Sequence, residues 1–127
     1  MRLTSLQPQW VNYESASYVD RFTDLHTHVE YDQEEVAEGY HDQSEEFAKA
    51  DGVMFLCPVC FVKNGGPVGT ESVLCWFANK PYIPASAIPG PGRWTASGSS
   101  FDDLSLSPSV NVSNGHWHGF ITNGEVT

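Results

Sequence analysis

VMFLCPVC, residues 53–60, is an apolar run of strand length that leads directly into the pair Cys57-x-x-Cys60. A short apolar run bounded by turn residues is typical of a buried strand. The loop sequence NGGP follows at residues 64–67 and favours a turn. We therefore expect a strand that ends in a knuckle carrying two thiols, and the rest of the chain is interpreted outward from it.

Toward the C-terminus the pattern is mostly that of β-structure. Apolar or alternating segments predict strands at 72–77, 93–97, 104–110 and 116–122. The dipeptide Asn123-Gly124 is favoured in tight hairpin turns. Residues 81–92 are rich in proline and glycine, so we expect a long ordered loop or a lid there.

Toward the N-terminus the chain is acidic, because residues 20–51 hold eleven of its sixteen acidic side chains. Alternation of apolar and polar residues predicts a strand at 25–31. Asp32 and Glu35 have the spacing of a capping box, and Gly39 is a typical helix end, so a short helix is expected between them. A second short helix is expected at 44–50.

The chain of 127 residues is long enough for one domain. We predict a single mainly β, small α+β domain over 1–127. It combines an acidic segment with short helices at 20–51 and an antiparallel, zinc-bearing β region at 52–127. A formal net charge of -10 disfavours binding to nucleic acid or to anionic membranes. No apolar stretch has the length of a membrane span, so no membrane association is expected.

Four side chains have the types and spacing of a structural zinc site. A C-x-x-C turn places two sulfurs on one side, and histidines at alternate positions of a strand share a face. Closed sites of two cysteines and two histidines usually hold zinc for structure. The predicted ligands are Cys57, Cys60, His116 and His118.

Other interpretations of the cysteines stay open. Cys57 and Cys60 are ordinary buried thiols if the two histidines line a solvent-facing strand. A thioredoxin-like redox role is disfavoured, because that motif opens a helix whereas a glycine turn follows here. Cys75 lies in an apolar strand and is expected in the core, with a reserve role as a ligand if one histidine does not reach. An odd number of cysteines, three, fits reduced thiols better than a disulfide framework.

A second, more open metal site is conceivable in the acidic segment. Histidine and carboxylate donors of this kind bind iron, manganese or zinc and permit metal-assisted chemistry. The simpler interpretation is a solvated acidic face, and no catalytic residue is assigned. The candidate donors are His26, His28, Glu30 and His41.

The chain resembles an uncharacterised family of small bacteriophage and prophage proteins, some of which carry the name ammonia monooxygenase. The resemblance lies in four motifs: MRLTSL at 1–6, FLCPVC at 55–60, LSPSV at 106–110 and GHWHGFITNGE at 115–125. It does not cover residues 20–51. The resemblance implies a zinc site on Cys57, Cys60 and His118, with His116 in place of a cysteine of the family. The monooxygenase name finds no support in these residues.

The resemblance also implies a phage origin and a place in the cytoplasm of the infected bacterial host. We hypothesise a small zinc-binding protein that acts as a protein-binding module. Its acidic segment would bind a host protein with a basic surface, for example as an anti-defence inhibitor. The alternatives are a metal-dependent enzyme with an open zinc or His/Glu site, and a minor virion or assembly component.

Overall fold

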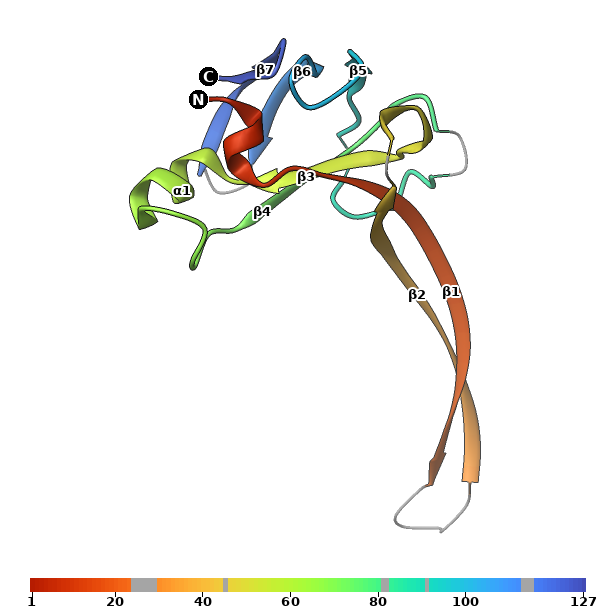
Figure 1. The fold of residues 1–127 in the computed structure, drawn as a ribbon. Helices are drawn as coiled ribbons and strands as arrows, with labels where there is room; N and C mark the ends of the chain where they lie inside the picture. Colours follow the sequence, from red (N-terminus) through yellow and green to blue (C-terminus); the bar gives the residue numbers. More distant parts are fainter. Residues whose placement is uncertain (24–29, 45, 81–82, 91, 113–115) are drawn as a thin grey trace.

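The computed structural model describes residues 1–23, 30–44, 46–80, 83–90, 92–112 and 116–127. Across these residues the chain forms two four-stranded sheets (Figure 1). All the strand pairs are antiparallel, so the prediction of a mainly β, antiparallel fold is confirmed. The first sheet has the order β2-β1-β3-β4, with β1 at Gln9–Thr23, β2 at Glu30–Ser44, β3 at Gly52–Leu56 and β4 at Ser72–Trp76.

The second sheet follows chain order. It contains β5 at Thr95–Ser97, β6 at Ser105–Val112, β7 at Trp117–Thr122 and β8 at Glu125–Val126. The described helical segments are short: 3-10 turns η1 at Leu3–Leu6 and η2 at Phe47–Lys49, and helix α1 at Pro58–Asn64. None of them is long and apolar enough to cross a membrane.

The main core lies between the two sheets. Phe55 of β3, 1% exposed, packs edge-on against Trp117 of β7 at a centroid distance of 6.0 Å. Trp10 of β1 stacks on Phe101 at 4.1 Å and meets Phe47 edge-on at 5.3 Å. Aromatic pairs of this kind add to the free energy gained from apolar burial. Both sheets therefore contribute to one core.

The other face of the first sheet is also covered. Trp76 of β4 is 1% exposed and clusters with Ile83 and Ala87 of the proline-rich loop. Its indole N–H donates to the carbonyl of Ile88 at 3.0 Å. The Arg93 guanidinium donates to loop carbonyls, among them that of Pro84 at 3.0 Å. Burial on both faces explains why β3 and β4 are nearly continuous apolar runs.

A long hairpin leaves this core. β1 pairs with β3 only through residues 9–11, but with β2 from Trp10↔Ser44 to Thr23↔Glu30. We call the paired residues 13–23 and 30–40 the arm, and the remaining described residues the body. Figure 1 shows the arm extending away from the body as a two-stranded ribbon. Ten residue steps of about 3.4 Å give the arm a length of about 34 Å.

The two ends of the chain lie side by side on the body (Figure 1). The Met1 ammonium donates to the Glu125 carboxylate at 3.2 Å and to the carbonyl of Val126 at 3.3 Å. The Arg2 guanidinium also donates to Glu125, at 3.2 Å. These bonds tie the N-terminus to β8.

The two helix predictions for the acidic segment are wrong. The helix expected from Asp32 to Gly39 is part of β2, because the long antiparallel ladder to β1 overrides a local capping pattern. In place of the helix expected at 44–50, the structure has only the three-residue 3-10 turn η2. The strand predicted at 25–31 lies mostly outside the described residues, and its last two residues belong to β2. No prediction was made for β1.

The remaining strand predictions are confirmed to within a few residues, as β3 to β7. Asn123 and Gly124 have φ values of 50° and 75° and connect β7 to β8, as the favoured hairpin dipeptide predicts. The segment after the second cysteine differs from the prediction. It is helix α1, which ends at Gly65 with φ 68° rather than breaking at once into a turn. The C-x-x-C pair thus does open a helix, as it does in a thioredoxin-like motif. The preceding strand differs, because β3 is antiparallel to both its neighbours.

Candidate metal site

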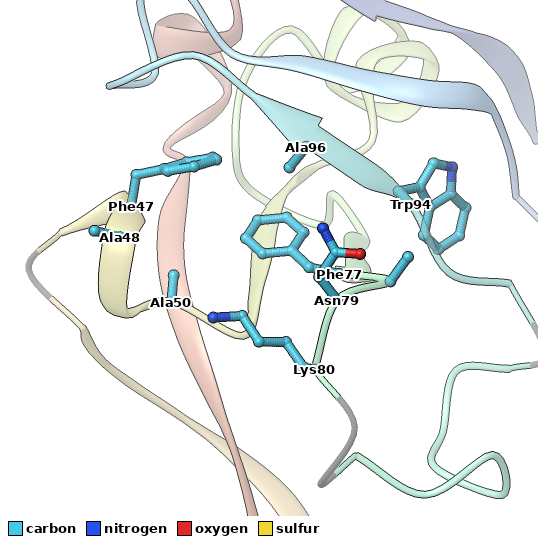
Figure 2. A pocket seen from close by; sticks show the side chains of 9 residues that line it. Phe47, Ala48, Ala50, Phe77, Asn79, Lys80, Trp94 and Ala96 are labelled. Atoms are coloured by element: carbon cyan, nitrogen blue, oxygen red, sulfur yellow. The ribbon is translucent and has the colours of Figure 1, made fainter.

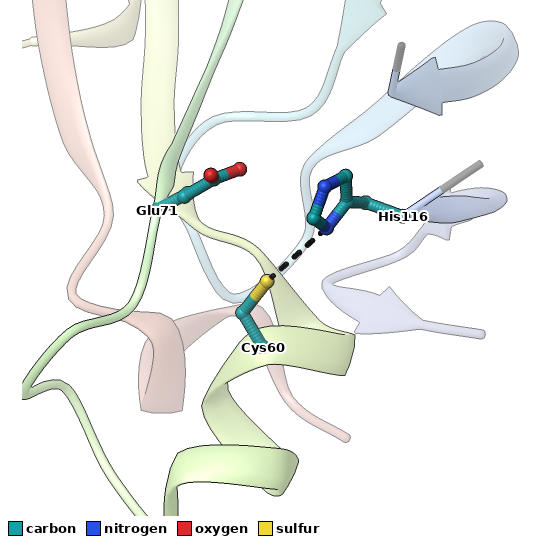
Figure 3. A group of neighbouring side chains, drawn as sticks. All are labelled: Cys60, Glu71 and His116. Atoms are coloured by element: carbon teal, nitrogen blue, oxygen red, sulfur yellow. Dashed lines mark hydrogen bonds between the residues drawn. The ribbon is translucent and has the colours of Figure 1, made fainter. Parts of the chain in front are cut away.

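Three side chains converge at the end of the molecule that carries α1. Cys60, Glu71 and His116 each offer a ligand atom, and these atoms all lie within 4.8 Å of one another. The Cys60 Sγ and His116 Nδ1 atoms are 3.7 Å apart. Figure 3 shows the three side chains pointing toward one another from α1, the chain before β4 and the turn before β7.

The local sequence explains the positions of the first two residues. β3 ends at Leu56, and Pro58 then starts α1, where its missing N–H costs nothing, so Cys60 lies on the first helical turn. Leu56 pairs with Ser72 across the β3–β4 ladder, which places Glu71 opposite Cys57. The Cys57 N–H donates to the Glu71 carbonyl at 2.8 Å and fixes this alignment.

His116 comes from the second sheet. It immediately precedes Trp117, the first residue of β7, which is 7% exposed and packs on Phe55. Because neighbouring side chains in extended backbone point to opposite sides, a buried Trp117 leaves His116 on the outside. The site thus forms where the two sheets meet.

The environment of Cys60 favours its neutral thiol. Its pKa is raised above the ordinary value, first by a hydrogen bond with the Cys57 thiol, then by burial and by the nearby negative charge that Cys57 carries when ionised. A hydrogen bond from the Glu71 backbone amide acts in the opposite direction. A metal ion that binds the Cys60 sulfur must therefore displace its proton.

The donor set suits a divalent metal. Thiolate, imidazole and carboxylate are the ligands that zinc takes in proteins, at about 2.3 Å for sulfur and about 2.0–2.1 Å for nitrogen. Two such ligands on one tetrahedral ion are about 3.6 Å apart, close to the Cys60–His116 separation of 3.7 Å. The cluster can hold a metal ion, and its geometry leaves the choice of metal open.

The structure places the four predicted ligands differently. Cys60 and His116 meet, and Cys57 is fully buried beside Cys60. His118 is exposed on β7, shares a 3.0 Å hydrogen bond with the Ser109 hydroxyl and is not in the cluster.

Cys75 occupies the core, as expected from its apolar strand. It is fully buried, and burial raises the pKa of its thiol to about 12. It is not one of the clustered residues. The cluster contains Glu71 instead, which the sequence predictions missed. The signal for it was the pairing of two adjacent apolar strands, which brings the residue before the second strand next to the first cysteine.

The predicted second site does not assemble around His41. His26 and His28 lie outside the described residues. Glu30 pairs with Thr23 at one end of the ladder, whereas His41 pairs with Asn12 at the other. Eleven residue steps along β2 separate them by about 37 Å, so the two cannot share an ion.

A hollow of about 170 Å³ lies beside η2, away from the cluster (Figure 2). Phe47, Phe77 and Trp94 line it, with the Lys80 amine and the Asn79 amide at its rim. Among the described residues that line it, Lys80 is the sole titratable side chain. The hollow therefore supplies no acid–base pair.

Comparison of the chain with models of known protein families, with curated proteins and with solved structures finds no match.

Proposed function

We propose that this protein is a zinc-binding module whose acidic arm recognises a basic surface on a partner protein. The observation that carries the proposal is the arm, which extends from the body as a ribbon (Figure 1). Its 22 residues include seven acidic residues and one arginine, a net charge of -6 out of -10 for the chain.

Strand register concentrates this charge. Four acidic residues of β2 occupy a row of alternate register positions, about 7 Å apart along the strand over most of its length. These positions are Glu30, Asp32, Glu34 and Glu38. A row of like charges complements a basic groove, raises the association rate and repels nucleic acid.

The arm has little to stabilise it by itself. A two-stranded hairpin is marginally stable in water without a further strand or a covering layer. β2 is the edge strand of its sheet, and charges on an edge oppose pairing with a second copy of the chain. A partner that covers the arm and neutralises its charge would stabilise it.

The resemblance to phage proteins makes the proposal more specific. The partner is then a host protein in the bacterial cytoplasm, and its blockade would serve an anti-defence role. A minor virion or assembly component remains the alternative, and it predicts copurification with particles.

The test is capture from a bacterial lysate at low salt, followed by titration of the purified captured protein. The arm variant Glu34→Gln/Glu38→Gln is compared with the body variant Glu46→Gln/Asp102→Asn, which changes net charge equally. Because salt screens contacts between charges, we expect rising salt to release the partner. The arm variant should release it at a lower salt concentration than the body variant does. Equal salt profiles for the two variants would exclude the arm as the binding surface.

A second candidate function has an observation of its own. Cys60, Glu71 and His116 line a surface pocket together with Lys63. Three protein ligands with a fourth position open to water are the arrangement of catalytic zinc. Water in the metal shell of the loaded protein, detected by X-ray absorption spectroscopy, would favour a metal-dependent enzyme.

A further inference from the structure

We propose that one zinc ion joins the two sheets through four protein ligands, Cys57, Cys60, Glu71 and His116. This inference rests on the zinc-binding part of the proposed function and is independent of the arm. It replaces His118 of the sequence-based ligand set with Glu71, and it assigns the ion a structural role.

The first argument is the position of Cys57. It lies between β3 and α1, three residues before Cys60, and its thiol interacts with that of Cys60. Its own N–H is bonded to the Glu71 backbone, which holds the β3–α1 turn against the start of β4. Cys57 therefore lies beside Cys60 on the buried side of the site, next to the three clustered residues rather than among them.

The second argument is burial. Cys60 is half-buried and Glu71 and His116 are exposed, whereas Cys57 is 0% exposed. Cys57 is therefore the thiol that can approach an ion held by the outer three donors from its buried side. A sulfur ligand there completes a tetrahedron, and a closed four-ligand shell is the mark of structural zinc.

The third argument is connectivity. The two cysteines and Glu71 belong to segments attached to β3 and β4 of the first sheet. His116 enters from the turn before β7 of the second sheet (Figure 3). The sheets also meet through apolar packing such as Phe55 on Trp117, and through backbone hydrogen bonds of Trp94 with Trp76 and Ala78 on the other side of the core. An ion at this edge would link them by coordinate bonds.

The test uses the full chain purified without chelator. Elemental analysis should find one zinc per chain, and zinc X-ray absorption should show two sulfur and two nitrogen or oxygen neighbours. This measurement on the unaltered protein needs no variant to fold. A shell with one sulfur would overturn the role of Cys57, and absence of zinc would overturn the site.

Variants then identify the ligands. Cys60→Ser, Glu71→Gln and His116→Ala should lose zinc, whereas His118→Ala should keep it. If Glu71→Gln kept its zinc and His118→Ala lost it, the proposed ligand set would be overturned in favour of the set predicted from the sequence. The salt-dependent capture assay probes the arm separately, so a failure of the ligand set and a failure of partner binding are distinguishable.

Discussion

The body and the arm are built from the same β-structure but are held together by different forces. In the body, both faces of the first sheet are buried, one by the second sheet and the other by the proline-rich loop. The arm is a ribbon that carries most of the net charge (Figure 1). Apolar burial therefore stabilises the body, whereas the arm depends on its backbone ladder.

A buried carboxylate lies at the junction between the two regions. Asp51 is 4% exposed, and its side chain accepts a 2.8 Å hydrogen bond from the N–H of Tyr13, the first residue of the arm on β1. Its backbone bonds to Val11 on one side and Phe77 on the other. Asp51 thus fixes the point where β1 leaves the body.

The largest contrast should come from deleting one phenylalanine ring in each region. Phe55→Ala removes a fully buried ring and should lower the free energy of unfolding by about 3–5 kcal/mol. Phe22→Ala, in the arm opposite Tyr31, should leave the unfolding midpoint of the body unchanged. Denaturant titration followed by tryptophan fluorescence measures both. Equal losses would show that the arm and body fold as one unit.

An intermediate effect is expected at the junction. Asp51→Ala removes the carboxylate that accepts from the half-buried Tyr13 N–H, which should cost about 1–3 kcal/mol. Amide hydrogen exchange should accelerate at Tyr13 and along the arm more than in β3 or β4. Asp51→Asn retains an acceptor oxygen and serves as the control. Uniform acceleration across all strands would mean that Asp51 stabilises the whole fold rather than the junction.

The smallest effects concern pH and lie within the body. The Met1 ammonium and Arg2 hold the pKa of Glu125 below its ordinary value of 4.5, and the Ser99 and Ser100 amides lower that of Asp103 below 3.8. Their stabilisation is therefore complete above these ordinary values and is lost as pH falls through the lowered pKa values.

Glu125→Gln and Asp103→Asn should each flatten the acid limb of a stability-versus-pH curve. Unchanged acid limbs in both variants would show that neither contact stabilises the body.

The sequence predicted the body well and the arm poorly, for a physical reason. β3, β4 and β7 bury apolar side chains, and this burial is visible in the sequence as a continuous apolar run in β3 and β4 and as alternation in β7. β2 has few apolar residues, and its charged pattern matches a capped helix as well as a strand. Its strand conformation comes from pairing with β1, which no local pattern encodes.

The metal site shows the same limit. Cys60 and His116 were predicted because cysteine and histidine are recognisable by type. Glu71 was not, because an acidic residue is informative only once the β3–β4 ladder places it beside a cysteine. His118 has the residue type of a ligand, but it bonds to the Ser109 hydroxyl and lies outside the cluster, which only the packing of the two sheets decides.

The adjacency of the two chain ends has a practical consequence. Met1 and Val126 are bonded to each other on the body, away from the arm (Figure 1). A tag or surface tether attached at either end would emerge at the same place and leave the ribbon pointing outward. An immobilised chain would therefore present its acidic row to a flowing analyte in one orientation, whichever end is used as the handle.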